Sequence, residues 1–147
     1  MQETLHEGLN RFTKLWFSMR VFITGISGFL GRHLARTLES QGHKVMGVDI
    51  NPNTIAELKR TNPLIPVLEG SICDSKTLKE IRYLLMRHGI THVVHAAANK
   101  YIEQNEERTL EAVDVNITGS ANIAKLCQEL SIPVLGISTD KAENPSS

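Results

Sequence analysis

The chain has 147 residues, 41% of them hydrophobic, and no net formal charge at pH 7, which fits one domain with a buried core and argues against electrostatic attraction to nucleic acid. No apolar run is long enough to span a bilayer, and the six histidines show no ligand spacing with a carboxylate, so we expect neither a membrane span nor a metal site. The two cysteines, Cys73 and Cys127, lie far apart in the sequence, which favours free thiols and a reducing, cytoplasmic location.

Residues 1–18 are the first candidate element. Apolar residues recur there at helical spacing, which predicts an amphipathic helix: Leu5, Leu9, Phe12 and Trp16. Such a helix would dock on the domain, on a partner subunit or on a membrane surface, or would cap an edge of the sheet. Met19 directly precedes the first predicted strand, so an alternative is that the protein starts there and that the leader is misannotated.

From residue 20 onward, short apolar runs alternate with helical patterns. We predict strands at 20–24, 44–49, 66–69, 91–95 and 133–138, and helices at about 29–40, 54–60, 75–88 and 109–130. Gly42 and Gly89 are predicted to end two of the helices, Asp74 or Ser75 to cap a third, and residues 51–54 to form a turn. This alternation predicts a doubly wound α/β fold of the Rossmann type, with a parallel sheet in the order 3-2-1-4-5.

A glycine-rich turn joins the first predicted strand to the first predicted helix. In the pattern Gly-x-x-Gly-x-x-Gly, Gly25 permits the tight turn, Gly28 lets a pyrophosphate approach the backbone, and Gly31 lets the helix pack on the sheet. The helix N-terminus at Phe29 would offer free N–H groups to the phosphates. Asp49, at the end of the second strand, could accept hydrogen bonds from the ribose hydroxyls, which favours NAD over NADP. The alternative is that the glycines serve only the turn and its packing.

Polar or small residues follow the other strands. The loops contain Ser71 and Ile72 after the third strand, Ala96, Ala97 and Ala98 after the fourth, and Ser138, Thr139, Asp140 and Lys141 after the fifth. The alanines would let a cofactor lie flat against the backbone. The hydroxyl, acid and base after the fifth strand could protonate and deprotonate a substrate, or they could form a turn with an ordinary surface ion pair.

Four strings carry a family resemblance: residues 25–31, 95–98 with Lys100, 116–119 and 137–145. Together they resemble the extended short-chain dehydrogenase/reductase family of NAD-dependent epimerases and dehydratases. More narrowly, they are similar to its nucleotide-sugar 4,6-dehydratase branch, the polysaccharide-biosynthesis type that acts on UDP-N-acetylglucosamine. The most specific string is Ser-Thr-Asp-Lys-Ala-Glu-Asn-Pro at 138–145. The resemblance implies an NAD(P)-binding Rossmann domain over 19–147 that is truncated before the substrate domain.

The resemblance also implies roles for single residues. Thr139 would hydrogen-bond the sugar 4-hydroxyl, Lys141 would remove the C5 proton, and Asp140 would protonate the departing C6 hydroxyl, while hydride moves from C4 to the cofactor and back to C6. Asn116 matches a helix asparagine that supports the active-site loop and its water. The expected cofactor-binding set is Gly25, Ser27, Gly28, Phe29, Leu30, Gly31, Asp49, Ser71, Ile72, Ala96, Ala97, Ala98, Lys100, Asn116 and Ser138.

The sequence departs from the family in one catalytic feature. The family has a Tyr-x-x-x-Lys pair shortly after the Asn-Pro, and this chain ends at Ser147, before that tyrosine; neither Tyr83 nor Tyr101 is placed to replace it. Ser71 stands where the family often has an acid that meets the adenine amine. We therefore expect the cofactor half of a nucleotide-sugar dehydratase, inactive alone. Alternatives are an epimerase or reductase of the same superfamily and a non-catalytic dinucleotide-binding module or sensor.

The expected partners are a UDP-linked nucleotide sugar and, as an open alternative, a second copy of the chain. The predicted helix at 109–130 carries an apolar stripe composed of Leu110, Val113, Ile117, Ala121 and Ala124. This stripe fits pairing with another subunit and burial against the sheet equally well.

Overall fold

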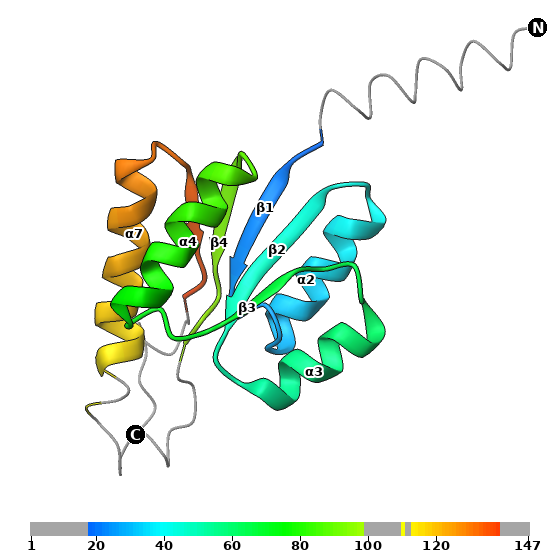
Figure 1. Ribbon diagram of the computed structural model, residues 1–147, viewed down its shortest axis with the longest axis horizontal. Helices are drawn as coiled ribbons and strands as arrows, with labels where there is room; N and C mark the ends of the chain where they lie inside the picture. Colours follow the sequence, from blue (N-terminus) through cyan, green and yellow to red (C-terminus); the bar gives the residue numbers. More distant parts are fainter. Residues whose placement is uncertain (1–17, 99–109, 111–112, 139–147) are drawn as a thin grey trace, which may run out of the picture.

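The computed structural model describes residues 18–98, 110 and 113–138, and shows one parallel sheet covered on both faces by helices (Figure 1). The sheet order is β3-β2-β1-β4-β5, as predicted, and every pairing is parallel. The strands are β1 (Arg20–Thr24), β2 (Lys44–Asp49), β3 (Val67–Glu69), β4 (His92–His95) and β5 (Val134–Gly136). The predicted Rossmann-type fold class is confirmed.

The helices form the two outer layers. They are α2 (Phe29–Ser40), α3 (Pro52–Thr61), α4 (Ser75–Arg87) and α7 (Ser120–Glu129), with a π-helical turn, η1 (Asp114–Gly119), leading into α7. Figure 1 shows α2 and α3 on one side of the sheet and α4 and α7 on the other. Within the described part of the chain, no helix is long and apolar enough to cross a membrane.

Alternating side chains of the central strands fill both layers. Phe22 of β1 belongs to the buried cluster that contains Ile81 of α4, whereas its neighbour Ile23 belongs to the cluster with Ala35 of α2 and Leu58 of α3. A strand that is covered on both faces must be apolar at consecutive positions, which explains the unbroken apolar runs of β1 and β4.

The helix ends follow local signals, with one correction. Helix α3 begins at Pro52 rather than at residue 54. Residues 51–54, which were predicted as a turn, are the cap and the first turn of this helix. The Asn51 side chain caps it by accepting from the N–H groups of Asn53 (3.0 Å) and Thr54 (3.3 Å). Proline at the first helical position is pre-organised for this geometry.

Three helices share one C-terminal motif. Gly42 after α2, Gly89 after α4 and Ser131 after α7 have φ angles of 87°, 56° and 55°. In each case this residue and the next donate their backbone N–H groups to carbonyls of the last helical turn, as from Ser131 to Gln128 (3.2 Å). The two glycines therefore end α2 and α4 as predicted, and Ser131 adopts the same left-handed conformation without being glycine.

The predicted helix at 109–130 is not regular where it is described. Its first part passes through the π-helical turn η1 before becoming α-helical at Ser120. Gly119 is pressed against the side chains of Ile72 and Cys73, and the Ser120 hydroxyl donates to the carbonyl of Asn116 four residues earlier (2.7 Å). Such back-bonding bends helices. The amphipathic helix predicted at 1–18 lies outside the described residues, apart from Ser18.

Candidate functional site

The carboxyl ends of the strands bring the glycine-rich turn against the loop after β4. Gly25 has a φ of 70°, and its N–H donates to the carbonyl of Val48 at 2.8 Å. A Cβ atom at Gly25 would lie 2.9 Å from the Cα atom of Ala97, which is closer than van der Waals contact. Glycine is therefore required here both by the backbone conformation and by the neighbouring loop.

The other two glycines of the turn meet different constraints. A Cβ atom at Gly31 would lie 2.1 Å from the carbonyl oxygen of Gly25, so only glycine lets α2 start this close to the turn. At Gly28 the φ angle is −66° and the nearest described atom would be 3.2 Å from a Cβ atom. The fold thus needs Gly31, whereas a Cβ atom at Gly28 would press on a single backbone oxygen, which must move by a few tenths of an ångström.

The N-terminus of α2 has no capping side chain and no acid in its first turn. In contrast, α3 is capped by Asn51 and α4 by Asp74, whose carboxylate accepts from the Thr77 N–H at 2.8 Å. Phe29 and Leu30, the first two residues of α2, are 64% and 46% exposed. The positive end of the α2 dipole is therefore available to an anion from outside the protein, which is the arrangement that binds pyrophosphate.

Asp49 lies beside this turn and supports it. One carboxylate oxygen accepts from the Ser27 N–H (2.9 Å), and the other accepts from the N–H groups of Ile50 (2.8 Å) and Asn51 (3.3 Å). Ser27 is buried, and its hydroxyl is hydrogen-bonded to Thr54 Oγ1 at 2.7 Å. Sequence reasoning placed Asp49 at the ribose but missed that it also holds the glycine-rich turn in place.

The loop after β3 is fixed to α7. Ser71 Oγ accepts from the Cys73 N–H (3.2 Å), and the carbonyl of Ile72 accepts from Asn122 Nδ2 (3.1 Å). The Ile72 side chain is buried in the core. Two residues of this loop are predicted to meet the cofactor. Ser71 is partly exposed, whereas Ile72 contributes mainly to packing.

A chain of hydrogen bonds connects β1, β4 and α7 behind the turn. Ala97 N–H donates to Thr24 Oγ1 (3.2 Å), and Thr24 Oγ1 lies 2.7 Å from His95 Nδ1. On the other side of the ring, His95 Nε2 lies 2.8 Å from Ser120 Oγ, which donates to the carbonyl of Asn116. Burial lowers the pKa of His95. Sequence reasoning gave His95, Thr24 and Ser120 no role, although a histidine that ends an apolar strand is an unusual residue there.

The remaining predicted site residues are only partly described. Ala96 and Ala97 are half-buried beside Gly25, while Ala98 and Ser138 are exposed. Lys100, Thr139, Asp140 and Lys141 lie outside the described residues, so their predicted roles stay predictions. Among the described residues, no group of three or more histidine, cysteine or acidic side chains could hold a metal ion.

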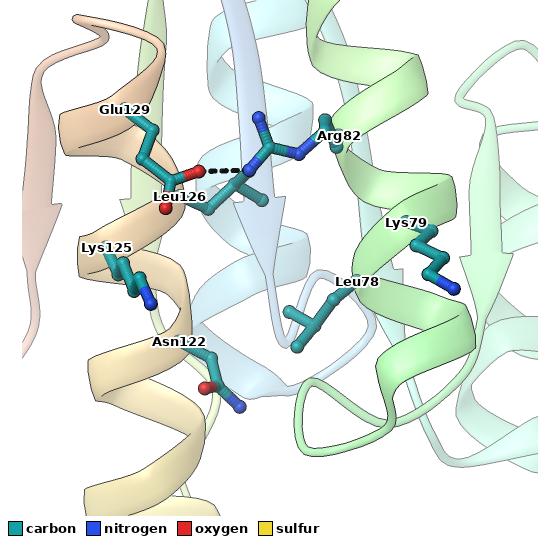
Figure 2. A pocket seen from close by; sticks show the side chains of 7 residues that line it. All are labelled: Leu78, Lys79, Arg82, Asn122, Lys125, Leu126 and Glu129. Atoms are coloured by element: carbon teal, nitrogen blue, oxygen red, sulfur yellow. Dashed lines mark hydrogen bonds and ion pairs between the residues drawn. The ribbon is translucent and has the colours of Figure 1, made fainter.

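A groove of about 260 Å³ lies elsewhere, between α4 and α7 (Figure 2). An ion pair between Arg82 and Glu129 crosses it, and both side chains are about two-fifths exposed, so the pair adds little stability. Its lining comes from the two helices rather than from the loops at the carboxyl ends of the strands: Leu78, Lys79, Arg82, Asn122, Lys125, Leu126 and Glu129. The groove is therefore separate from the glycine-rich turn.

Known proteins are similar to this chain in both sequence and fold. UDP-glucuronate 4-epimerase 3 of Arabidopsis thaliana is 31% identical over 115 residues, which cover 74% of this chain and 26% of that protein. CDP-glucose 4,6-dehydratase of Salmonella typhimurium is 26% identical over 128 residues, covering 86% and 36%. The crystal structure of UDP-glucose-4-epimerase from Stenotrophomonas maltophila, with bound NAD and formylated UDP-arabinopyranose, matches with a TM-score of 0.73 and 26% identity, covering 84% of this chain and 38% of that one.

The chain thus spans between about a quarter and two-fifths of the length of these proteins. A family model described as the NAD dependent epimerase/dehydratase family matches residues 21–144, which is most of the chain. The chain belongs to the NAD dependent epimerase/dehydratase family.

Proposed function

We propose that this chain binds NAD at the carboxyl ends of its strands and forms the cofactor-binding part of an enzyme that acts on nucleotide sugars. The observation that carries the proposal is the uncapped N-terminus of α2 beside Gly28, the glycine of the turn at which a Cβ atom would press on a single backbone oxygen. A glycine at this place, which has no side chain, suits a pyrophosphate that must approach the backbone closely.

Residues at the carboxyl ends of the strands would contact the successive parts of NAD. The N–H groups of Phe29 and Leu30 would hold the pyrophosphate, and Asp49 would accept from the adenosine ribose while keeping its bond to the turn. Ser71 would lie near the adenine, and Ala97 near the nicotinamide end. When bound, NAD supplies reversible hydride acceptance. NADP is disfavoured, because a 2′-phosphate would meet the carboxylate of Asp49.

The more specific proposal is a 4,6-dehydratase acting on a UDP-linked sugar such as UDP-N-acetylglucosamine. It rests on Thr139, Asp140 and Lys141: a hydroxyl to orient the sugar 4-hydroxyl, an acid for the C6 oxygen and a base for the C5 proton. Asp140 needs a raised pKa to act as an acid near pH 7, and Lys141 needs a lowered pKa to act as a base. One similar protein is named as a 4,6-dehydratase, acting on CDP-glucose.

A 4-epimerase is the second candidate, because the similar Arabidopsis protein is named as a UDP-glucuronate 4-epimerase. An epimerase changes only the configuration at C4 and needs neither the acid for C6 nor the base for C5. The residues Asp140 and Lys141 therefore distinguish the two candidates. A dinucleotide-binding module without catalysis is the third outcome of the same experiment.

The apolar stripe that precedes and enters α7 is proposed to pair with a second copy of the chain. Leu110, Val113 and Ile117 are 80%, 41% and 64% exposed, and Ala121 and Ala124 are exposed as well, so this stripe is not part of the core. Small residues at its far end would allow two helices to approach closely. The two free cysteines fit a reducing compartment, and we propose a cytoplasmic location.

The test is an assay of the full-length protein in which this chain occurs. Purified enzyme is incubated with NAD and UDP-N-acetylglucosamine, and the product is identified by NMR. A 4-keto-6-deoxy sugar that disappears in Asp140→Asn and Lys141→Met would support dehydration. A sugar inverted at C4, formed equally by both variants, would show that the protein is an epimerase. NAD binding without any turnover would leave a binding module.

A further inference from the structure

We propose that His95 is a positioning residue: as a neutral ring protonated on Nε2, it completes a one-directional chain of hydrogen bonds that holds the loop after β4 and the π-helical turn η1 in place around the cofactor. The claim that His95 affects cofactor binding rests on the proposed function, whereas the claim about the tautomer of its ring does not. The chain runs from Ala97 through Thr24, His95 and Ser120 to Asn116.

The donor-to-acceptor direction of these hydrogen bonds is fixed at the Ser120 end. A serine hydroxyl has a single hydrogen, and Ser120 donates it to the carbonyl of Asn116 at 2.7 Å. The contact of 2.8 Å between Ser120 Oγ and His95 Nε2 can then be a hydrogen bond only if Nε2 carries the proton and donates it. This assigns the proton of the ring from its partners.

The other end agrees with this assignment. Thr24 is fully buried, and its hydroxyl oxygen already accepts from the Ala97 N–H at 3.2 Å. The hydroxyl hydrogen therefore needs an acceptor, and unprotonated Nδ1 of His95 lies 2.7 Å away. A proton on Nδ1 would leave the Thr24 hydrogen buried without that acceptor, which is costly. Burial of the ring, which lowers its pKa, acts in the same direction.

Both ends of this series of hydrogen bonds lie at the candidate site. Ala97 is the residue whose backbone sets the space around Gly25, with 2.9 Å from its Cα atom to a Cβ atom at that glycine. Asn116 lies within η1, which also touches the loop after β3 through the bond of Cys73 Sγ to the carbonyl of Asp114 (3.2 Å). Loss of the ring would release the Ala97 loop from η1, although His95 itself is only half-buried and need not touch the cofactor.

The ring is tested directly by NMR of the protein labelled with ¹⁵N-histidine at pH 7, since protonated and unprotonated ring nitrogens differ strongly in chemical shift. His95 should show a protonated Nε2 and an unprotonated Nδ1. The opposite tautomer, or a doubly protonated ring, would overturn the proposal. This readout does not require NAD binding, so it remains decisive if the proposed function fails.

The positioning role is tested by NAD titration of His95→Phe and His95→Gln in the full-length protein, together with amide exchange of Ala97. Phenylalanine keeps an aromatic ring and removes both hydrogen bonds, whereas the glutamine amide offers a carbonyl acceptor and an NH2 donor group and should restore part of the loss. The matched control is His92→Gln, because His92 is exposed on the same strand and, among the described side chains, is hydrogen-bonded only to the neighbouring Thr91.

We expect His95→Phe to raise the Kd for NAD about tenfold, which corresponds to the loss of about one hydrogen bond, and to speed exchange of the Ala97 amide. His95→Gln should lie between Phe and wild type, and His92→Gln should match wild type. Equal affinity and equal Ala97 exchange in all four proteins would overturn the positioning role. A wild-type protein that binds no NAD would refute the proposed function, and the Ala97 exchange and the tautomer would still decide this proposal.

Discussion

Replacing Gly31 by alanine should loosen the joint between the glycine-rich turn and α2. The added Cβ atom would lie 2.1 Å from the Gly25 carbonyl oxygen and 2.8 Å from the Ile26 Cα atom. Both contacts are with backbone, so neither can be relieved by turning a side chain. The start of α2 must therefore move away by roughly 1 Å to reach normal contact distances.

Overpacking of this kind costs about 1–3 kcal/mol. For a chain of this size the melting temperature should fall by about 3–10 °C, which thermal unfolding followed by circular dichroism can measure. The same movement displaces the N–H groups of Phe29 and Leu30, so the affinity for NAD should fall by roughly tenfold or more, as expected when charge-assisted hydrogen bonds are weakened.

The matched control is Gly136→Ala in β5. A Cβ atom there has no described atom within 4 Å, so the melting temperature should change by about 2 °C at most. If Gly31→Ala melts at the wild-type temperature, the close approach of α2 to the turn is not what makes this glycine necessary, and the reasoning about the site would be refuted.

Three further predictions follow from local contacts. Ser131→Gly should stabilise the protein by about 0.5–1 kcal/mol, because φ is 55° there, and an unchanged or lower free energy of unfolding in urea would contradict this. Asn51→Ala should cost about 1 kcal/mol by removing the cap of α3, and Asn51→Asp, which keeps an acceptor, should lose much less in the same urea titration. The lowered pKa of His95 means that the unfolded chain takes up a proton at higher pH than the folded chain, so the free energy of unfolding should decline as pH falls from about 6.5 towards the folded pKa; in His95→Gln this part of the pH dependence should be absent.

Features governed by neighbouring residues could be predicted from the sequence. The bounds of β1, α2 and β2 were correct, because apolar periodicity and the glycine Gly42 define them locally. The order of the strands followed from the alternation of strands and helices. The predicted start of α3 was wrong, because Asn51 and Pro52 are compatible with both a turn and a helix cap.

The parts that were missed depend on contacts distant in sequence. The hydrogen bonds of His95 join it to Thr24 and Ser120, which are 71 and 25 residues away. The π-helical turn ends at Gly119, which lies against the side chain of Ile72. Nothing in the local pattern of residues 109–130 distinguishes this geometry from a regular helix, and the residues packed against Gly119 come from another loop.

Asp49 has a structural role in addition to the ligand contact that the sequence predicts for it. Its place after β2 predicts a ribose contact, while its bond to the Ser27 N–H appears only in the folded structure. This bond ties the second strand to the glycine-rich turn, so a change at Asp49 would affect the turn as well as the predicted ribose contact. For that reason Asp49 is a poorer test of cofactor binding than Gly28.

The central claim is that the uncapped start of α2 binds the pyrophosphate of NAD, and Gly28→Ala tests it most directly. A Cβ atom at Gly28 would lie 3.2 Å from the nearest described atom, so the variant should fold and melt within a few degrees of wild type. The measurement is calorimetric titration with NAD of the wild type and the variant. The account predicts saturable binding by the wild type and a loss of at least tenfold in Gly28→Ala. Equal affinity of the two folded proteins, or no binding by the folded wild type, would contradict it.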